Sequence, residues 1–150
     1  MTYLPDVNLW VALTVSGHVH HRTAAGWLEE AGDEILTFCR VTQMGFLRLL
    51  TNERVMGEDV FTADRAWSLL ERLRRHDRVT FSAEPPGLER TWQTMTMPHK
   101  TGANFWTDAY LAAFAMNTGC TLVTFDCGFH KFKKLPVRIL GTSTPSSYVP

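Results

Sequence analysis

The sequence lacks several features that define large classes of protein. No apolar run approaches the roughly 20 residues of a membrane-spanning helix, and the N-terminus lacks the basic and long apolar regions of a secretory signal. The cysteines are few, odd in number and form no C-x-x-C pair, which argues against a disulfide framework; they are Cys39, Cys120 and Cys127. We therefore expect a cytoplasmic protein in a reducing setting, with no membrane association.

The sequence also has no excess of charge of one sign. The formal net charge is zero, so no global basic field indicates nucleic acid. The basic residues form two clusters: Arg72, Arg74, Arg75 and Arg78, and Lys131, Lys133, Lys134 and Arg138. Each cluster is either a phosphate-binding patch or the solvated end of a helix or strand. Neither a G-x-x-x-x-G-K nor a G-x-G-x-x-G string occurs, which argues against a nucleotide cofactor.

Strand-like and helical segments alternate along the chain, whose 150 residues suit a single domain spanning residues 1–150. We predict strands over residues 2–6, 34–39, 78–82, 121–125 and 137–140. We predict helices over residues 7–15, 20–31, 42–50, 62–76, from after Pro86 to about 94, and around Asp108 to 117 or 118. The alternation predicts an α/β fold with a mainly parallel sheet covered on both faces, followed by an irregular Pro/Ser-rich tail.

Several single residues are expected to mark the ends of these segments. Pro5 donates no ladder hydrogen bond, so we expect it at the last paired position of its strand. Thr42 and Thr62 are candidate N-caps of the helices that follow them. Asn52 is a candidate cap for the C-terminal end of the helix over 42–50.

Three aspartates stand where strand, loop and helix meet. Asp6 ends the first predicted strand, Asp108 opens an apolar helix, and Asp126 closes the string T-L-V-T-F-D. Ligands bind at the carboxyl ends of strands in open α/β sheets. Two ionised carboxylates about 5 Å apart repel by roughly 3 kcal/mol, so such a cluster needs a cation or raised pKa values. An all-oxygen site suits Mg²⁺ or Mn²⁺, which can activate a water for phosphodiester hydrolysis.

Each aspartate also has an ordinary structural explanation. Asp6 can cap a helix, Asp108 can complement the positive end of its helix, and Asp126 can be a turn residue. The three together favour a site. A phosphatase with Asp6 as nucleophile would need a second aspartate two residues on, where Asn8 stands instead.

Four strings carry a family resemblance. They are D-V-N-L-W at residues 6–10, G-F-L-R-L-L-T-N at 45–52, T-D-A-Y-L-A-A-F-A at 107–115 and L-V-T-F-D-C-G-F at 122–129. In this order, and with H-H-R-T-A-A-G-W-L at 20–28, the chain resembles the PIN-domain ribonucleases, in particular the VapC toxins of bacterial toxin–antitoxin pairs.

The resemblance implies a compact three-layer α/β/α sandwich of the PIN type and cleavage of RNA by a water activated by Mg²⁺ or Mn²⁺. It also implies a VapB-like antitoxin that blocks the site, and a toxin homodimer. Asp6, Asp108 and Asp126 would then be the catalytic metal ligands, and Thr124 would hold the site by hydrogen bonding.

One departure from the family pattern concerns Gln43, which stands where many members have a glutamate. Glutamine can orient a ligand or a water but cannot act as a carboxylate base. We expect retained activity with weaker metal affinity; the alternative is a catalytically silent PIN-like scaffold that binds RNA or a protein. Arg48, expected to be buried on the same helix, could pair with an acid, meet RNA phosphate or serve a subunit contact.

Histidines and aromatic residues offer further candidates. His18, His20 and His21 lack the H-E-x-x-H spacing, so zinc is disfavoured. Trp92, Phe105 and Trp106 could stack on unpaired bases, although a place in the core or a subunit interface is favoured. His99 and Lys100 could meet substrate phosphate or simply belong to an exposed loop.

Overall fold

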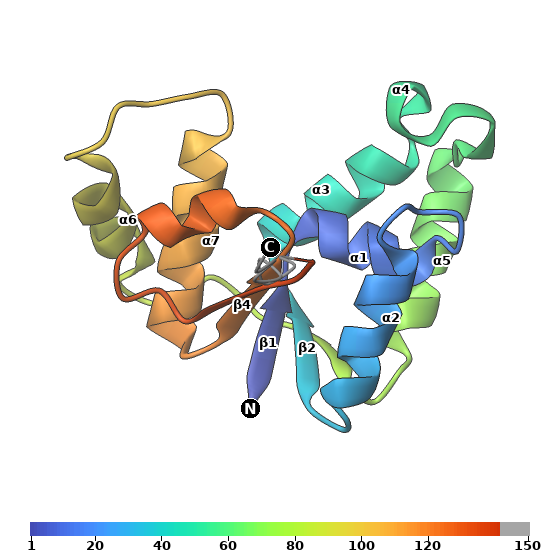
Figure 1. The fold of residues 1–150 in the computed structure, drawn as a ribbon, viewed down its shortest axis with the longest axis horizontal. Coiled ribbons are helices and arrows are strands. Elements are labelled where there is room, and N and C mark those ends of the chain that lie inside the picture. Colours follow the sequence, from blue (N-terminus) through green and yellow to red (C-terminus); the bar gives the residue numbers. More distant parts are fainter. Residues whose placement is uncertain (142–150) are drawn as a thin grey trace, which may run out of the picture.

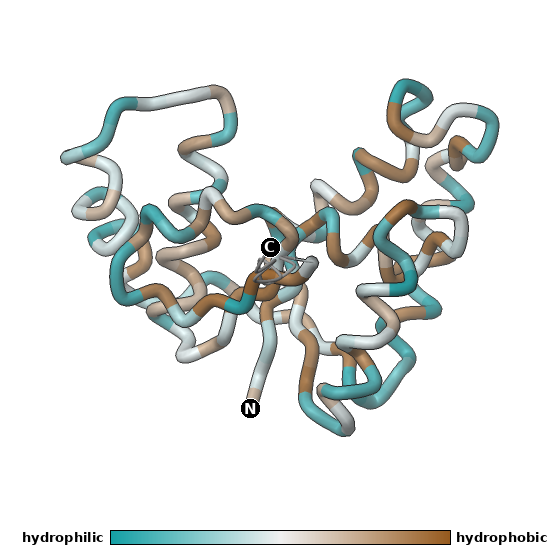
Figure 2. The backbone as a smooth tube through the Cα atoms, viewed as in Figure 1, coloured by the Kyte–Doolittle hydropathy of each residue, from teal (hydrophilic) through white to brown (hydrophobic). Residues whose placement is uncertain are grey.

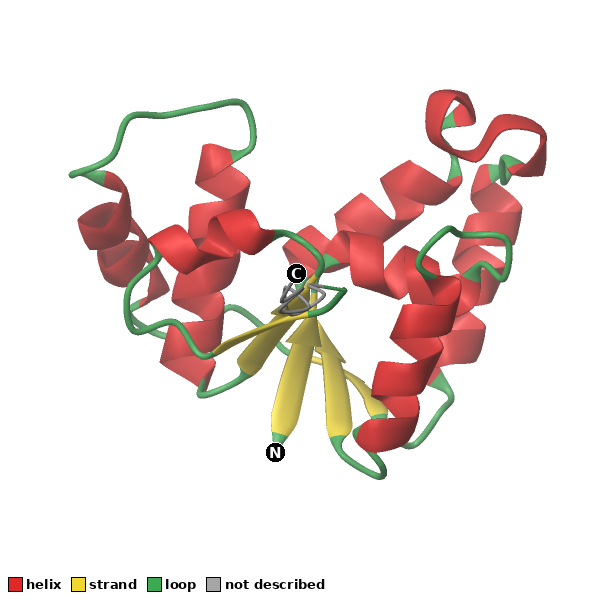
Figure 3. Ribbon diagram, viewed as in Figure 1, coloured by secondary structure: helices red, strands yellow, loops and turns green. Residues whose placement is uncertain are grey.

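The sheet is parallel and the first strand lies at its centre (Figure 3). The structure is a computed structural model that describes residues 1–141, so the predicted Pro/Ser-rich tail lies outside the described residues. The strands are Thr2–Pro5 (β1), Ile35–Phe38 (β2), Val79–Phe81 (β3), Thr121–Thr124 (β4) and Val137–Ile139 (β5). Their order is β3-β2-β1-β4-β5, and every neighbouring pair is parallel. The predicted α/β class with a parallel sheet is confirmed.

Helices cover both faces of this sheet, with α6 and α7 on one side and α1, α2, α3 and α5 on the other (Figure 1). They are Val7–Thr14 (α1), His21–Glu30 (α2), Arg40–Leu50 (α3), Glu53–Met56 (α4), Ala63–Arg74 (α5), Leu88–Thr96 (α6) and Phe105–Thr118 (α7), with 3-10 turns Gly57–Asp59 (η1) and Cys127–Lys131 (η2). None of the described helices is both long and apolar enough to cross a bilayer. The predicted three-layer sandwich is confirmed.

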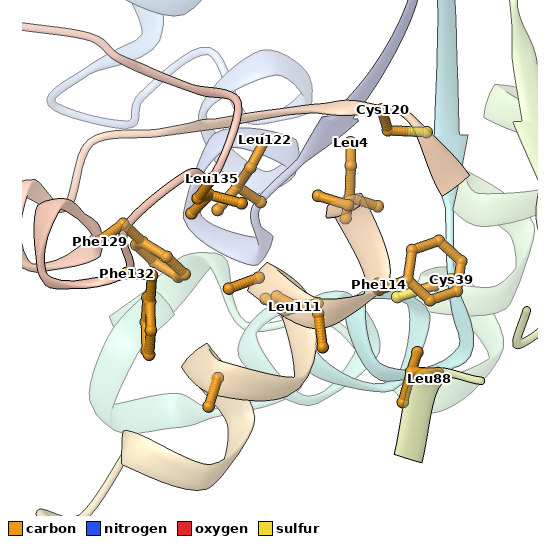
Figure 4. Packing of buried hydrophobic residues seen from close by; sticks show 14 of the residues in the cluster. Leu4, Cys39, Leu88, Leu111, Phe114, Cys120, Leu122, Phe129, Phe132 and Leu135 are labelled. Atoms are coloured by element: carbon orange, nitrogen blue, oxygen red, sulfur yellow. The ribbon is translucent and has the colours of Figure 1, made fainter. Parts of the chain in front are cut away.

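Each face of the sheet has its own hydrophobic core. Leu4 and Leu122 pack against α7 and Phe114 in one core (Figure 4). Val123, the next residue along β4, belongs to the other core, where the rings of Trp10 and Phe38 stack with centroids 3.9 Å apart. Hydrophobic and hydrophilic residues alternate along most helices, as expected for elements with one buried side (Figure 2).

The end of β1 explains how a proline is accommodated in a central strand. Pro5 is the last paired residue of β1 and lies opposite Val123, as predicted. The next amide, that of Asp6, continues the ladder by donating to the Val123 carbonyl at 2.9 Å. The chain then turns directly into α1, which places Asp6 at the carboxyl edge of the sheet.

Two predicted caps were wrong. Helix α3 begins after Cys39, and Thr42 lies in its first turn, where its hydroxyl accepts from the Cys39 amide at 3.0 Å. Asn52 caps the start of α4, not the end of α3, because its side chain accepts from the Arg54 amide at 2.9 Å. Thr62 does cap α5, as predicted. The short elements α4, η1 and η2 were not predicted, since each is built from local turns without hydrophobic periodicity.

Helices α1 and α3 approach each other closely at a glycine. A Cβ placed on Gly45 would lie 2.5 Å from Cγ2 and 3.2 Å from Cγ1 of Val7, the first residue of α1. Valine in a helix is confined largely to one rotamer, so its methyl groups cannot simply turn away. Gly45 therefore sets the distance between α3 and the start of α1, immediately after Asp6.

We predict that Gly45→Ala lowers the free energy of unfolding by about 1–2 kcal/mol, because the clash with Val7 outweighs the better helix propensity of alanine. Urea unfolding followed by circular dichroism measures this change. Val7→Ala in the same protein should recover part of the loss.

Gly26 provides the matched control. It lies within α2, and a Cβ there meets nothing within 4 Å. Gly26→Ala should leave stability unchanged or raise it by up to about 1 kcal/mol. Equal effects of the two substitutions would contradict the close approach at Gly45.

Candidate active site

Three elements deliver the aspartates to one edge of the sheet. Asp6 directly follows β1, and Asp126 follows β4 by two residues. Because β1 and β4 are parallel neighbours, their carboxyl ends meet at the same edge. Asp108 lies in the first turn of α7, which runs back into β4 and therefore begins near that edge. Each of the three carboxyl groups acts electrostatically on at least one of the others.

Asp6 is held by two hydrogen bonds. One carboxylate oxygen accepts from the Val7 amide at 2.7 Å, which caps α1. The other accepts from the Thr124 hydroxyl at 2.9 Å. The Thr124 hydroxyl oxygen in turn accepts from the Asp126 amide at 3.0 Å. Thr124 is 1% exposed, so its hydroxyl has little freedom to turn to other partners. It thus joins the two aspartates that follow the central strands.

Asp126 is exposed and has a structural function of its own. It caps the turn η2, because its side chain accepts from the Gly128 amide at 2.7 Å. The explanations of Asp6 as a helix cap and Asp126 as a turn residue are therefore both correct. They are compatible with a site, since each carboxylate oxygen has a second lone pair.

Burial and mutual repulsion raise the pKa values of two of the acids. Burial raises the pKa of Asp6, assisted by the charge of Asp126 and opposed by the hydrogen bonds from Val7 and Thr124. Burial also raises the pKa of Asp108 to about 6, with contributions from Asp6 and Asp126. The Lys131 ammonium opposes this shift. Such perturbation is typical of clustered functional carboxylates.

The chemistry of these donors fits a hard divalent cation, because only carboxylate oxygens are offered. The spacing is open, however: among the described residues, no three acidic, histidine or cysteine side chains converge closely enough to hold an ion directly. Mg²⁺ commonly uses one or two carboxylates and keeps several waters. The acids therefore suit an ion held partly through water rather than a closed protein cage.

Gln43 is buried, with 3% of its surface exposed, in the first turn of α3. Its side-chain oxygen accepts a hydrogen bond from the Arg40 guanidinium, which lies over the Phe81 ring at 4.6 Å from the centroid. No hydrogen bond within residues 1–141 joins Gln43 to the three aspartates. Its observed hydrogen bond thus lies within α3, where Arg40 in turn contacts Phe81 of β3, and its role toward a ligand stays a prediction.

Arg48 does not lie where we expected it. It is exposed rather than buried, on the last turn of α3, and it borders a surface hollow with Thr51 and Glu53. None of the salt bridges found in the described part of the chain includes it. The expected burial of Arg48 is therefore wrong, because that face of α3 points to solvent, and its contact with substrate phosphate or a second subunit stays a prediction.

Lys131 is the neighbour of the acids that sequence reasoning did not single out. Its ammonium lies 5.4 Å from the Phe105 ring centroid and 5.2 Å from that of Phe132, and its charge acts on Asp108. The basic cluster a few residues after Asp126 was the available signal. Sequence alone could not tell which of its members faces the acids.

The remaining candidates have mainly structural contacts. The Trp92 indole donates to the Trp106 carbonyl at 3.0 Å, and their rings pack edge to face. Trp106 is nonetheless 53% exposed on the α6–α7 side. The His21 ring hydrogen-bonds the Ala12 carbonyl, and His20 stacks on Phe125. In the described part of the molecule, the histidines belong to no group arranged to bind a metal.

Comparison with known proteins shows the family to which this fold belongs. The PIN-domain family model matches residues 3–135. Ribonuclease VapC41 of Mycobacterium tuberculosis is 40% identical over 142 residues, which cover 91% of this chain and 97% of that protein. Ribonuclease VapC38 of the same organism is 33% identical over 141 residues, which cover 91% of this chain and 96% of that protein.

Solved structures share the fold at low sequence identity. VapBC2 from Rickettsia felis, bound to a DNA fragment from its promoter, gives a TM-score of 0.69 at 14% identity and covers 93% of this chain and 99% of that one. Mycobacterium tuberculosis VapC20, a toxin that cleaves the sarcin-ricin loop, gives a TM-score of 0.59 at 18% identity and covers 87% of this chain and 93% of that one. The chain therefore belongs to the PIN-domain family, among relatives named VapC ribonucleases.

Proposed function

We propose that the protein is a metal-dependent endoribonuclease that acts as the toxin of a toxin–antitoxin pair. The proposal is supported by the positions of Asp6, Asp108 and Asp126, which are far apart in sequence. They lie directly after β1, in the first turn of α7 and shortly after β4, toward the same edge of the sheet. Membership of the PIN-domain family and 40% identity to a protein named Ribonuclease VapC41 support an RNA substrate and hydrolysis.

In this proposal Asp6, Asp108 and Asp126 hold Mg²⁺ or Mn²⁺. A divalent ion supplies charge that neutralises the phosphate and makes a water more acidic. Both oxygens of Asp6 already accept hydrogen bonds, from Val7 and Thr124. The Asp108 carboxylate accepts none from the described residues, so its oxygens are the better placed to take the proton of the attacking water. Thr124 positions Asp6 and the start of the Asp126 turn.

The partners follow from the same family membership. We infer a VapB-like antitoxin, since fold relatives include VapBC2 of Rickettsia felis and VapBC-1 of Haemophilus influenzae. We also infer a homodimer, for which the exposed Trp106 and Met97 on the α6–α7 side offer an apolar surface. The three free thiols support a cytoplasmic setting.

A catalytically silent scaffold is the second candidate. Two observations favour it. Gln43 offers no carboxylate, and its side-chain oxygen already accepts a hydrogen bond from Arg40. Among the described residues, no three acidic side chains lie close enough together to bind an ion directly. Such a scaffold would bind RNA or a protein without cleaving it. Metal binding and cleavage assays separate the two candidates.

We predict that Asp6→Asn, Asp108→Asn and Asp126→Asn each lower RNA cleavage by at least about 100-fold, because each removes a negative charge from the ion's surroundings. A fluorogenic RNA assay measures the rate, and growth inhibition on expression gives a second readout. Asp77→Asn, an exposed change in the turn before β3, is the control and should retain activity. Wild-type cleavage by any of the first three would remove that residue from the site.

We predict that Thr124→Val lowers both cleavage and the free energy of unfolding, the latter by about 1–3 kcal/mol, while Thr124→Ser retains most of each. Valine keeps the volume but leaves an Asp6 oxygen and the Asp126 amide without their partner. Urea unfolding and the RNA assay measure the two effects. Identical behaviour of the valine and serine variants would show that the hydroxyl does not hold the site.

We predict that Mn²⁺ binds the wild type with heat measurable by titration calorimetry and that Asp108→Asn weakens binding by about tenfold or more. Removal of divalent ions with EDTA should abolish cleavage, and Mg²⁺ or Mn²⁺ should restore it. Absence of both binding and cleavage would favour the silent scaffold.

A further inference from the structure

A cavity of about 360 Å³ opens between α6, the loop that follows it and the end of η2. Lys131 in its lining contacts Phe105, at the start of the helix that carries Asp108. Residues that line it include Thr94, Met95, His99, Lys131, Phe132 and Lys133. Its volume is in the range of sites that accept a small molecule or one unit of a polymer. The lining, all of it within the described residues, contains no carboxylate, in contrast to the acidic site.

The exposed Lys131 side chain extends over two aromatic rings. Its ammonium lies 5.4 Å from the Phe105 centroid and 5.2 Å from the Phe132 centroid, within the distance of a cation–π interaction. Both rings are buried, so they form a firm support. Phe105 is the first residue of α7 and lies about one helical turn before Asp108. The ammonium therefore lies close to the start of the helix that carries Asp108.

The ammonium is also free to bind an anion. No salt bridge found in residues 1–141 includes Lys131, and aromatic faces leave its three N–H donors unused. Its charge lowers the pKa of Asp108 and so offsets part of the negative field of the acids. A polyanionic strand that approaches three carboxylates needs such a compensating cation. His99 and Lys133 provide further donors in the same lining.

We propose that this cavity, the Lys131 cavity, is a subsite for single-stranded RNA, in which Lys131 binds a phosphate flanking the one that is cleaved. The inference rests on the proposed function for the identity of the strand. Phe132 forms part of the wall beside the phosphate, and His99 and Lys133 lie where the neighbouring nucleotide enters. Lys131 is a substrate-positioning residue, distinct from the three acids.

Fluorescence anisotropy of a labelled oligouridylate of about 12 nucleotides, in EDTA, tests the subsite without cleavage. Lys131→Met keeps the apolar stem on the two rings but removes the charge. It should weaken binding about tenfold at low salt and reduce the slope of log K against log salt by about 0.7, the value for one phosphate contact on a single strand. An oligoadenylate should show the same loss, because a phosphate contact is independent of base.

Lys134→Met is the matched control, since Lys134 is exposed on the same segment and does not line the cavity. It should bind like the wild type, and Lys131→Arg should restore most of the affinity. In cleavage assays with Mn²⁺, Lys131→Met should raise KM more than it lowers kcat.

Equal losses for Lys131→Met and Lys134→Met, or an unchanged slope for Lys131→Met, would overturn the inference. So would a wild type that does not bind the oligonucleotide. A wild type that cleaves RNA while Lys131→Met binds normally would overturn only the subsite. If Lys131→Met reduces the salt slope as expected but the wild type does not cleave RNA, the subsite would be supported and the proposed hydrolase contradicted.

Discussion

The Thr124 hydroxyl donates to Asp6 and accepts from the amide of Asp126, and this pair of hydrogen bonds fixes two of the three acids relative to each other. It depends on the parallel pairing of β1 with β4, in which Pro5 lies opposite Val123. Residues alternate between the two faces of a strand, so a slip of one residue would point Thr124 to the opposite side. The site is therefore a consequence of strand register, and its geometry is stabilised by the same cores that hold the sheet.

The gathering of acids is costly, and local structure offsets part of that cost. Two carboxylates about 5 Å apart repel by roughly 3 kcal/mol at an effective dielectric near 20. The Asp6 carboxylate accepts hydrogen bonds from a helix amide and from a hydroxyl, and the Asp126 carboxylate accepts one from the Gly128 amide. Asp108 has no such partner in the described chain, and its pKa rises to about 6, mainly through burial. The residue with the least structural support is thus the one most available for chemistry.

Much of the fold was predictable, because β-branched strands and amphipathic helices alternate with clear periodicity. The aspartates were recognisable because strands end directly before Asp6 and shortly before Asp126. The errors concern contacts that no local pattern encodes. Cys39 rather than Thr42 precedes α3, because strand β2 runs almost directly into the helix. Arg48 was misplaced because the exposed side of α3 is decided by packing against α1 and α5.

The contacts of Arg40 and Lys131 with aromatic rings were beyond sequence reasoning for the same reason. The Gln43–Arg40 hydrogen bond joins residues three apart on α3, but Arg40 also lies over Phe81 of β3, which is far along the chain. The place of Lys131 depends on Phe105, far earlier in the chain.

Diffraction from a crystal soaked in Mn²⁺ would show whether the three aspartates share one ion, because anomalous scattering locates the ion itself. The account predicts a peak between Asp6, Asp108 and Asp126, with at least one carboxylate oxygen at about 2.1–2.2 Å and waters completing the octahedron. A Mn²⁺ peak bound elsewhere on the protein, with none among these three acids, would contradict it.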